Sequence, residues 1–433
     1  MYLIRKIAVK PAFICILLEK VPFSVYNIFI CNCNISCGKT AFTLKEHSFM
    51  KLILSKIKTY CGKLDKLLLF MCIGIAGFAV FIQYTLYEND ISSAVTASQY
   101  KTQLIAFIGG LVIALILALI NYKYLAKLWF IYVPAALGLT LLLFTPLGLQ
   151  REGADDIGWL DLGIVTIQPS EILKLAFILS LAFHLSKVED RMNEPIHFIL
   201  LCIHGAIPTL LIRQTGDDGS AIVFLFIFLC MMFAAGLSWK YLVLIAVAVP
   251  PAIYVLWNYL MQPHQQKRFQ VLWDTQMQEG EALGIYMQQR VGKIALGSGG
   301  LTGLGLSDGE YTYVPEIHND FIFSYIGMTM GLLGCLLVVG LLAALSLKIL
   351  SNASSAKDTL GRLICIGVFA LIVFHTAVNI GMVLGVAPVI GIPLPFFSAG
   401  GTSGICLFVA IGLVLSVSYH NSTKYRMFYT EKE

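Results

Sequence analysis

Ten long apolar runs divide this chain, and they limit it to one kind of fold. They lie at about 67–86, 104–120, 128–145, 169–186, 196–212, 220–236, 241–260, 321–347, 361–384 and 402–419. A helix of roughly 20 apolar residues crosses the hydrocarbon core of a bilayer, and only a helix or a closed barrel satisfies its backbone there. Only 13% of the residues are charged, about half the share of a soluble protein. We therefore predict an all-α polytopic membrane protein with about ten transmembrane helices and a large loop between the seventh and eighth.

The basic residues indicate which ends of the helices face the cytoplasm. With both termini inside, 16 Lys and Arg from Lys51 onward fall on the cytoplasmic side and 7 on the other, four of these in the 263–320 loop. Cytoplasmic loops carry such an excess. We expect both termini in the cytoplasm and the polar, turn-rich clusters outside. The net charge of +5 reflects this sidedness, so we expect no nucleic-acid partner.

The N-terminal region differs from the rest of the chain. Residues 1–49 contain no clean spanning run, whereas Met50 opens a lysine-rich stretch that leads into the first apolar run. We expect 1–49 to be an upstream extension or a disordered or interfacial arm, and 50–433 to be the transmembrane domain. Most of the 11 cysteines lie in apolar runs and form no disulfide framework.

Three titratable residues stand at the entry to the eighth apolar run. Glu316, His318 and Asp320 fall within Val314–Phe323, at the expected border of water and lipid. A carboxylate there can be dehydrated enough to act as a base and remain open to a substrate. The alternative is structural, because Asn and Asp commonly cap the first turn of a helix.

The fourth apolar run opens with a charged pair. In Gln168–Lys174, Glu171 and Lys174 are three residues apart and share one helical face. A lysine inside a span costs about 2.5–3.5 kcal/mol on insertion scales, so it needs a partner or a task. Either the pair only fixes helix packing, or Lys174 faces an anionic headgroup.

Two further polar connections could bind a ligand. Arg213–Ser220 contains Asp217 and Asp218, which could hold a divalent cation such as Mg²⁺ or Mn²⁺, or could merely form a turn and a cap. Gly297–Gly305 lacks the strand and the Lys-Ser/Thr ending of a phosphate loop, which favours a flexible segment packed on the outer surface. Lys293, nearby, could meet sugar rings and phosphates.

The stretch Pro388–Thr402 cannot be a straight helix. It contains three prolines and three glycines, yet it is too apolar for an ordinary exposed loop. Irregular backbone at membrane depth survives only where it is buried in protein or lines a cavity. We predict a broken or re-entrant segment that lines a cavity.

Taken together, these motifs resemble those of the SEDS family of shape, elongation, division and sporulation proteins, and their sequences are most similar to the RodA branch. The family patterns Q-P-S-E-x-x-K and P-E-x-H-x-D-F-I-F stand here as Gln168–Lys174 and Pro315–Phe323. N-I-G-M and G-x-P-L-P-F-x-S-x-G-G stand as Asn379–Met382 and Gly391–Gly401. The family's Q-P-D-x-G-T-A is loosened to Gln214–Ala221, which leaves open whether Asp217 or Asp218 corresponds to its acid.

The resemblance implies a glycosyltransferase that polymerises lipid II at the outer face of the bacterial cytoplasmic membrane for cell elongation and shape. It implies a class B penicillin-binding protein as partner and undecaprenyl pyrophosphate as the leaving group. Asp320 would be the catalytic base. The substrate-binding candidates are Glu171, Lys174, Arg213, Lys293, Glu316, His318 and Ser398.

Two other classes of function fit the sequence. Broken helices and intramembrane charges also mark transport paths, so a lipid II flippase or transporter is the main alternative. The charged clusters gather at one face, whereas a transporter more often places its sites at both faces or near the midplane. A non-catalytic scaffold for envelope assembly is the third interpretation.

Overall fold

The computed structural model describes residues 62–91, 95–150, 156–163, 166–281, 284, 286–307 and 309–427. The chain divides into two units, Met1–Gly62 and Lys63–Glu433, and nearly all described residues belong to the second. The expected boundary at Met50 and the 1–49 extension lie outside the described residues.

The second unit is built mainly of helices. They are α4 (Lys66–Glu88), α5 (Ala97–Leu119), α6 (Tyr122–Lys127), α7 (Trp129–Leu141), α8 (Pro169–Lys187), α9 (Pro195–Gln214), α10 (Asp218–Ala235), α11 (Trp239–Val255), α12 (Pro263–Gln270), α13 (Thr275–Gly280), α14 (Met287–Ser298), α15 (Ile322–Ser354), α16 (Thr359–Leu384) and α17 (Gly401–Met427). Three short helical turns are η2 (Leu142–Phe144), η3 (Glu189–Arg191) and η4 (Leu256–Leu260). The predicted helical membrane fold is confirmed.

Nine helices within the described ranges are long and apolar enough to cross a membrane: α4, α5, α8, α9, α10, α11 with η4, α15, α16 and α17. The third expected run corresponds to α7 with η2, Trp129–Phe144, which is shorter. Helix ends follow local chemistry: Pro169 opens α8, and left-handed Gly236 and Gly385 close α10 and α16. The count of ten crossings stays a prediction.

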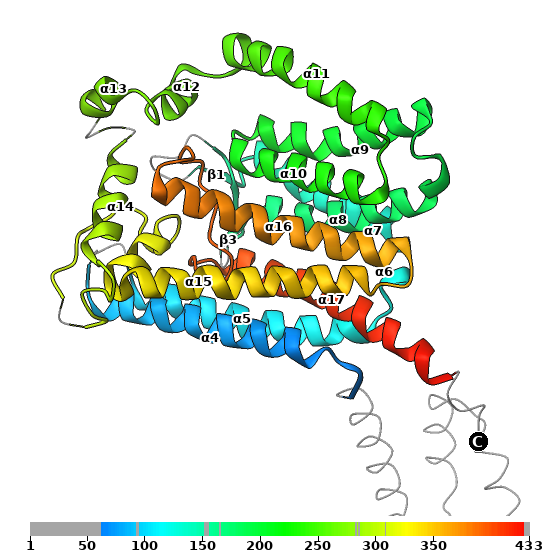
Figure 1. The fold of residues 1–433 in the computed structure, drawn as a ribbon, viewed down its shortest axis with the longest axis horizontal. Coiled ribbons are helices and arrows are strands. Elements are labelled where there is room, and N and C mark those ends of the chain that lie inside the picture. Colours follow the sequence, from blue (N-terminus) through cyan, green and yellow to red (C-terminus); the bar gives the residue numbers. More distant parts are fainter. Residues whose placement is uncertain are drawn as a thin grey trace, which may run out of the picture. The chain divides into compact units, whose positions relative to one another are not determined.

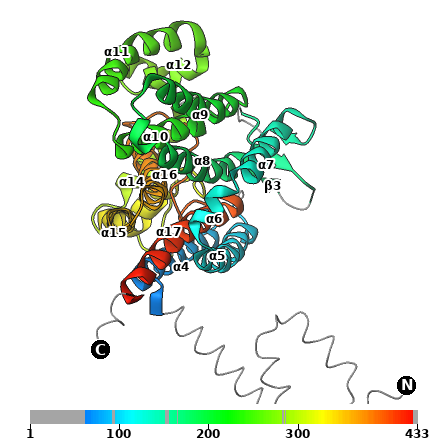
Figure 2. The ribbon, with the colours of Figure 1, turned by 90° about the vertical axis from the view of Figure 1, so that its right-hand side faces the viewer.

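The helices differ widely in burial. The spanning windows of α8, α17 and α16 are 72%, 67% and 56% buried, whereas that of α11 is 0% buried. Figure 1 shows α11 along one edge of the unit, and Figure 2 shows α16 among its neighbours. The polar side chains of α8 and α16 therefore lie in the best-packed part of the fold.

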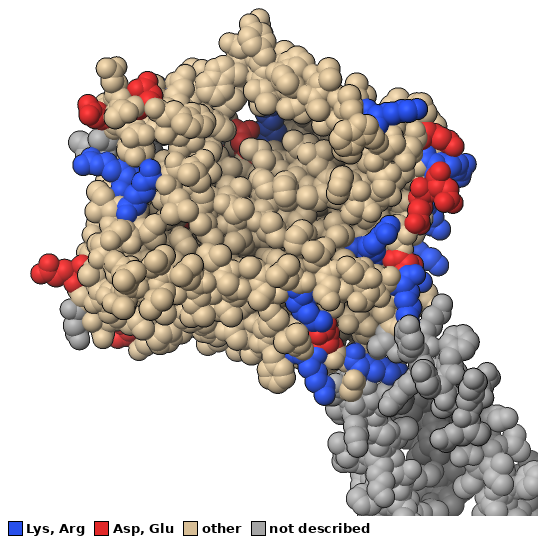
Figure 3. Space-filling view, in the orientation of Figure 1, with Lys and Arg blue, Asp and Glu red and all other residues tan. Residues whose placement is uncertain are grey.

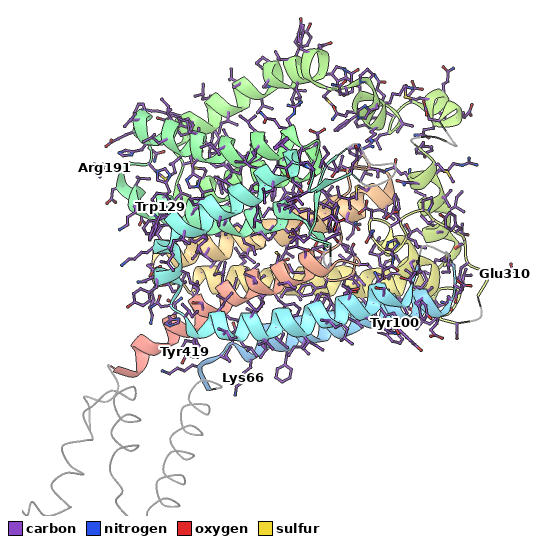
Figure 4. The ribbon with its side chains drawn as sticks, turned by 180° about the vertical axis from the view of Figure 1, so that it is seen from behind. Lys66, Tyr100, Trp129, Arg191, Glu310 and Tyr419 are labelled. Carbon is purple, nitrogen blue, oxygen red and sulfur yellow. The ribbon has the colours of Figure 1, made fainter. Side chains whose placement is uncertain are left out.

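The helices begin and end at two opposite ends of the unit. Figure 4 places Lys66, Arg191 and Tyr419 toward one end, and Tyr100 and Glu310 at the other. We call these the Lys66 end and the Glu310 end. Lys, Arg, Asp and Glu concentrate at the two ends in Figure 3, with a largely uncharged band between them. The arrangement has the two polar ends and apolar middle that a membrane-spanning bundle requires.

A small sheet, which the sequence analysis did not predict, lies in the connection before α8. Strands β1 (Gly148–Leu149), β2 (Trp159–Asp161) and β3 (Thr166–Ile167) pair antiparallel in the order β1-β2-β3. Strands of two or three residues are too short to show an alternating pattern in sequence. The Ile157 amide donates to the carbonyl of Thr215 at 2.9 Å, which places this connection beside the start of α10.

The glycine-rich stretch does more than cover the surface. Gly331 interrupts α15 with φ 64° and ψ −162°, and the 299–305 backbone forms hydrogen bonds to α15 on both sides of this interruption. The expected packing of Gly297–Gly305 on the surface is therefore only part of its role, because its backbone also completes the hydrogen bonding of α15. Composition indicated a turn-rich stretch but could not show that α15 is interrupted to receive it.

Candidate active site

Asp320 lies in a turn that leads directly into α15. The turn covers Pro315–Phe321, and the residue at the N-cap position is Phe321, whose side chain makes no capping hydrogen bond. Asp320 stands one residue before the N-cap position, so the alternative that Asp320 is the N-cap residue of this helix is wrong. Asp320 is half-buried. Its carboxylate lies near Gly391, where a Cβ atom would be 3.9 Å from Oδ2.

Three successive main-chain carbonyls in this turn each accept a hydrogen bond from a different side chain. Gln83 on α4 donates to the carbonyl of His318 at 2.9 Å. Ser398 donates to that of Asn319 at 2.7 Å, and Asn379 on α16 donates to that of Asp320 at 2.9 Å. Side chains distant in sequence thus fix the backbone that carries the carboxylate.

The irregular stretch that follows α16 packs against this turn. Residues 386–400 contain no helix, and Ile392 and Leu394–Ser398 are buried. We call 388–400 the proline segment. The same side chains hold it: Gln83 donates to Phe397 O at 2.8 Å and Asn379 to Ile392 O at 2.8 Å. The prediction of a broken segment that lines a cavity is confirmed, since Pro393, Leu394 and Ser398 line the cavity described below.

Helix α5 adds a further hydrogen bond to the proline segment. Buried Gln103 donates to the carbonyl of Phe396 at 2.6 Å. Ser398 accepts from the amide of Leu394 at 2.7 Å and is 6% exposed. Both hydrogen bonds of the Ser398 hydroxyl thus go to main-chain groups. Ser398, which was predicted to bind substrate, therefore stabilises the backbone of the site.

A small cavity borders the proline segment on the side of α8. Its lining includes Glu171, His375, Pro393, Leu394, Ser398 and Ser403. It encloses about 40 Å³, room for a few water molecules. Most of its lining is apolar, and a cavity of this size is too small for a sugar ring.

Glu171 and Lys174 form the predicted ion pair on one face of α8. Lys174 Nζ lies 2.5 Å from Glu171 Oε1, and Lys174 is 1% exposed. The same ammonium is 3.4 Å from Nε2 of His375 on α16. His375 Nδ1 is in turn 3.4 Å from the carbonyl of Pro393. The pair is thereby connected to the proline segment.

The two candidate metal ligands face different partners. Asp217 caps α10 by accepting from the Ser220 amide at 2.8 Å. Asp218 accepts from Gln265 on α12 and lies 3.7 Å from Arg213 Nε. Burial and the charge of Asp156 raise the pKa of Asp217, although Ser220 and Lys174 oppose the rise.

This donor set does not form a cation cage. In the part of the chain that the structure describes, no group of three or more His, Cys, Asp or Glu side chains is placed to hold a metal. One carboxylate is used as a cap and the other in an ion pair, which leaves few free oxygen ligands. The divalent cation stays a prediction, and no step proposed below passes through it.

The remaining candidates surround the same turn and segment. Glu316 is exposed, and its Oε2 accepts from Asn319 Nδ2 at 2.9 Å. Asn319 Nδ2 is also 3.1 Å from His318 Nε2. Lys293 on α14 lies against Gly385, just before the proline segment, with its ammonium 5.8 Å from the Tyr286 ring centroid.

The proline segment is the common neighbour of these groups. The start of α10 touches it because a Cβ on Gly219 would overlap the carbonyl of Ile390. Arg268 reaches the carbonyl of Val389 at 3.5 Å. The structure thus brings Asp320, Glu171, Lys174 and Ser398 into one connected network, with Arg213 and Lys293 on the adjoining helices α9 and α14.

Sequence reasoning missed His375, Gln83 and Gln103. Each is a single polar residue within an apolar run, and each is buried. Polar residues inside a span are costly and usually have a task, which is the one signal that could have singled them out. Their partners are main-chain groups more than 200 residues away for Gln83 and Gln103, which no local pattern reveals.

The fold and the site define a class: a multi-pass membrane protein with a half-buried carboxylate beside an irregular, proline-rich segment near the Glu310 end. The family model described as cell cycle protein, for FtsW, RodA and SpoVE, matches residues 64–423. The chain belongs to this family, the SEDS family.

Curated relatives agree over most of their length. The peptidoglycan glycosyltransferase MrdB of Escherichia coli K12 is 33% identical over 371 residues, covering 84% of this chain and 96% of the relative. The probable peptidoglycan glycosyltransferase FtsW of Bacillus subtilis is 30% identical, with coverage of 84% and 92%.

Solved structures show the same architecture. A chain from a structure on coordination of polymerization and crosslinking by a peptidoglycan synthase complex is 26% identical, with a TM-score of 0.70 and coverage of 83% of this chain and 98% of that one. The rod shape determining protein RodA of Thermus thermophilus shares the fold, with 24% identity, a TM-score of 0.61 and coverage of 82% and 96%.

Proposed function

We propose that this protein is a peptidoglycan glycosyltransferase that polymerises lipid II at the outer face of the cytoplasmic membrane. The observation that carries the proposal is Asp320, a half-buried carboxylate on a turn whose three carbonyls are fixed by Gln83, Ser398 and Asn379. Relatives over almost their full length are named as peptidoglycan glycosyltransferases. A fixed, half-buried acid suits proton transfer at a membrane border.

In the proposed reaction, the 4-hydroxyl of one lipid-linked disaccharide attacks the anomeric carbon of the growing strand. A new glycosidic bond forms, the bond from that carbon to the diphosphate breaks, and undecaprenyl pyrophosphate leaves with the electron pair. Asp320 takes the hydroxyl proton. A positioned base of this kind contributes about 10²–10⁴-fold to rate.

Cations near the departing diphosphate would lower the barrier. The Arg213 side chain is 31% exposed and so can meet a ligand beside its ion pair with Asp218. Lys174 is fully buried and paired with Glu171. We therefore assign direct phosphate contact to Arg213, with Lys293 as a second candidate, and assign to Lys174 the support of the proline segment through His375.

The proposed orientation puts the Glu310 end outside the cell and both termini in the cytoplasm. The excess of Lys and Arg assigned to the cytoplasmic side supports it. A class B penicillin-binding protein is the proposed partner, since a similar chain comes from a peptidoglycan synthase complex with polymerization and crosslinking.

The decisive experiment supplies purified protein, in liposomes, with fluorescent lipid II, alone and with a co-purified class B penicillin-binding protein. We expect glycan polymer that lysozyme digests, in a larger amount with the partner present. Movement of labelled lipid II between leaflets without polymer would instead indicate a transporter. An absence of both, in folded protein with its partner, would indicate a scaffold.

A further inference from the structure

Helix α15 consists of two parts separated by one residue. Gly331 has φ 64° and ψ −162°, a combination that is accessible essentially only to glycine. The first part, Ile322–Met330, begins two residues after Asp320, and the second part runs from Leu332 to Ser354. In an unbroken helix, Leu332 and Leu333 would donate to the carbonyls of Met328 and Thr329.

The loop 299–305 supplies partners for all four of these backbone groups. Leu332 N donates to Gly300 O at 2.9 Å and Leu333 N to Leu301 O at 3.2 Å. Leu304 N donates to Met328 O at 2.9 Å and Gly305 N to Thr329 O at 3.1 Å. The loop thus bridges the two parts of α15 with the hydrogen bonds that the interruption released. Buried backbone groups require such partners.

Glycine is required where the two backbones meet. A Cβ on Gly331 would lie 2.5 Å from the Gly303 nitrogen and the Leu301 carbonyl oxygen. A Cβ on Gly299 would overlap the carbonyl of Gly327, and one on Gly303, whose φ is +85°, would overlap that of Thr329. The loop fits the interruption only because these three positions lack side chains.

Helix α14, which precedes the loop, also packs against the beginning of α15. A Cβ on Gly292 would lie 2.7 Å from Cδ1 of Phe321, the residue after Asp320. Gln289 donates to the carbonyls of Met382 and Ala387, at 2.8 and 2.9 Å, just before the proline segment. One helix therefore contacts both the residue after Asp320 and the end of α16 that leads into the proline segment. Figure 1 shows α14 beside the ends of α15 and α16.

We propose that α14 and the loop 299–305 act as a splint that sets the position of Asp320 against the proline segment. Gly299, Gly303 and Gly331 are then positioning residues for the reaction. The splint fixes the direction of Ile322–Met330, and Asp320 is carried at the beginning of that part. The catalytic consequence depends on the proposed function, whereas the positional consequence can be measured without it.

The test uses matched glycine substitutions. Gly331→Ala is compared with the control Gly340→Ala in the same helix. Gly299→Ala is compared with the control Gly297→Ala at the end of α14. A Cβ at either control position meets nothing within 4 Å. In the lipid II assay we expect Gly331→Ala and Gly299→Ala to lower kcat by about 10²-fold, since small misplacements of a catalytic group cost that much. KM should change little, whereas the unfolding temperature of both variants should fall because the added Cβ meets backbone atoms. Both controls should match wild type in all three measurements.

A second measurement reports the position of residue 320 independently of turnover. Asp320→Cys is combined with each glycine substitution, and the rate of labelling at residue 320 by a charged thiol reagent is followed by mass spectrometry. We expect several-fold changes in that rate for Gly331→Ala and Gly299→Ala and none for the controls. If Gly331→Ala does not fold, Gly299→Ala, at an ordinary φ of −74°, decides the question.

The two proposals fail in different ways. Wild-type protein that forms no polymer would reject the glycosyltransferase proposal, while the labelling rates would still test the splint. Wild-type protein that forms polymer, together with unchanged kcat and unchanged labelling in Gly331→Ala and Gly299→Ala, would reject the splint alone.

Discussion

At the scale of single residues, the site is organised by amides that bind main-chain carbonyls. Asn379 joins Asp320 O to Ile392 O, and Gln83 joins His318 O to Phe397 O. Each amide therefore ties the Asp320 turn to the proline segment. The main chain on both sides of the junction is thereby held by side chains from α4 and α16.

Replacing Asn379 by leucine, which has nearly the same shape, should loosen this junction. Two carbonyl oxygens would lose their donor, and an unsatisfied buried acceptor costs about 1–3 kcal/mol. We expect a lower unfolding temperature in detergent and a lower rate of polymerisation. The exposed Asn258→Leu is the control. Equal unfolding temperatures for the two variants would argue against a bridging role for Asn379.

The Glu171–Lys174 pair should show strong energetic coupling. Removal of one partner leaves a buried charge alone, which costs about 3–5 kcal/mol, whereas removal of both can be nearly neutral. We expect Lys174→Met and Glu171→Gln each to destabilise the protein more than the double variant does. Denaturant unfolding of all four proteins gives the coupling energy. Additive effects would mean that the pair seen at 2.5 Å is not formed in the membrane.

The sequence predicted the residues of this site better than their roles. Spacing alone indicated that Glu171 and Lys174 would pair, because residues three apart share a helical face. It indicated substrate binding for Ser398 and a possible cap for Asp320, whereas Ser398 binds backbone and Phe321 occupies the cap position. Whether a side chain meets substrate or main chain depends on tertiary contacts that no local pattern contains.

At the scale of elements, α16 shows how a helix end can make stability depend on pH. Its cap is Asp358, toward the Lys66 end, which accepts from the Gly361 amide at 2.8 Å and from Tyr122 Oη at 2.7 Å. Lys123 Nζ lies 2.7 Å from the same carboxylate. Burial alone would raise the pKa of Asp358, but these hydrogen bonds and the lysine charge lower it overall.

Because the folded-state pKa of Asp358 is lowered, its charged form stabilises the fold. This contribution is complete above the unfolded pKa of about 3.9 and is lost as pH falls through the lower folded value. We expect Asp358→Asn to lower the unfolding temperature at pH 7 and the difference from wild type to shrink toward pH 3. Exposed Asp190→Asn serves as the control. A difference that is constant with pH would contradict this assignment.

Long apolar runs made the helices predictable, while breaks within them remained hidden. The runs at 169–186 and 361–384 correspond to α8 and α16 within a few residues. Gly331 stands among many glycines in apolar runs, and its sequence context does not distinguish it from Gly340. The difference lies in the loop 299–305, which opposes Gly331 and leaves Gly340 in open space.

At the scale of the whole molecule, the two ends of the bundle should face opposite sides of the membrane. Glu310 and Arg191 lie at opposite ends of the described unit (Figure 4). We expect Glu310→Cys to react with a membrane-impermeant thiol reagent in intact cells, and Arg191→Cys to react only after the membrane is opened. Mass spectrometry of the labelled peptide confirms that residue 310 or residue 191 is the modified site. The reverse pattern would place the site in the cytoplasm and overturn the proposed orientation.

In the proposed reaction, Asp320 is the base that activates a sugar hydroxyl, and every other step follows from this role. The direct measurement compares purified wild type, Asp320→Asn and the exposed control Glu310→Gln with lipid II and the partner protein, after each is shown to be folded. We predict that Asp320→Asn loses about 10²–10⁴-fold in polymerisation rate and that Glu310→Gln keeps the wild-type rate. Polymer formation by Asp320→Asn at the wild-type rate would contradict the account.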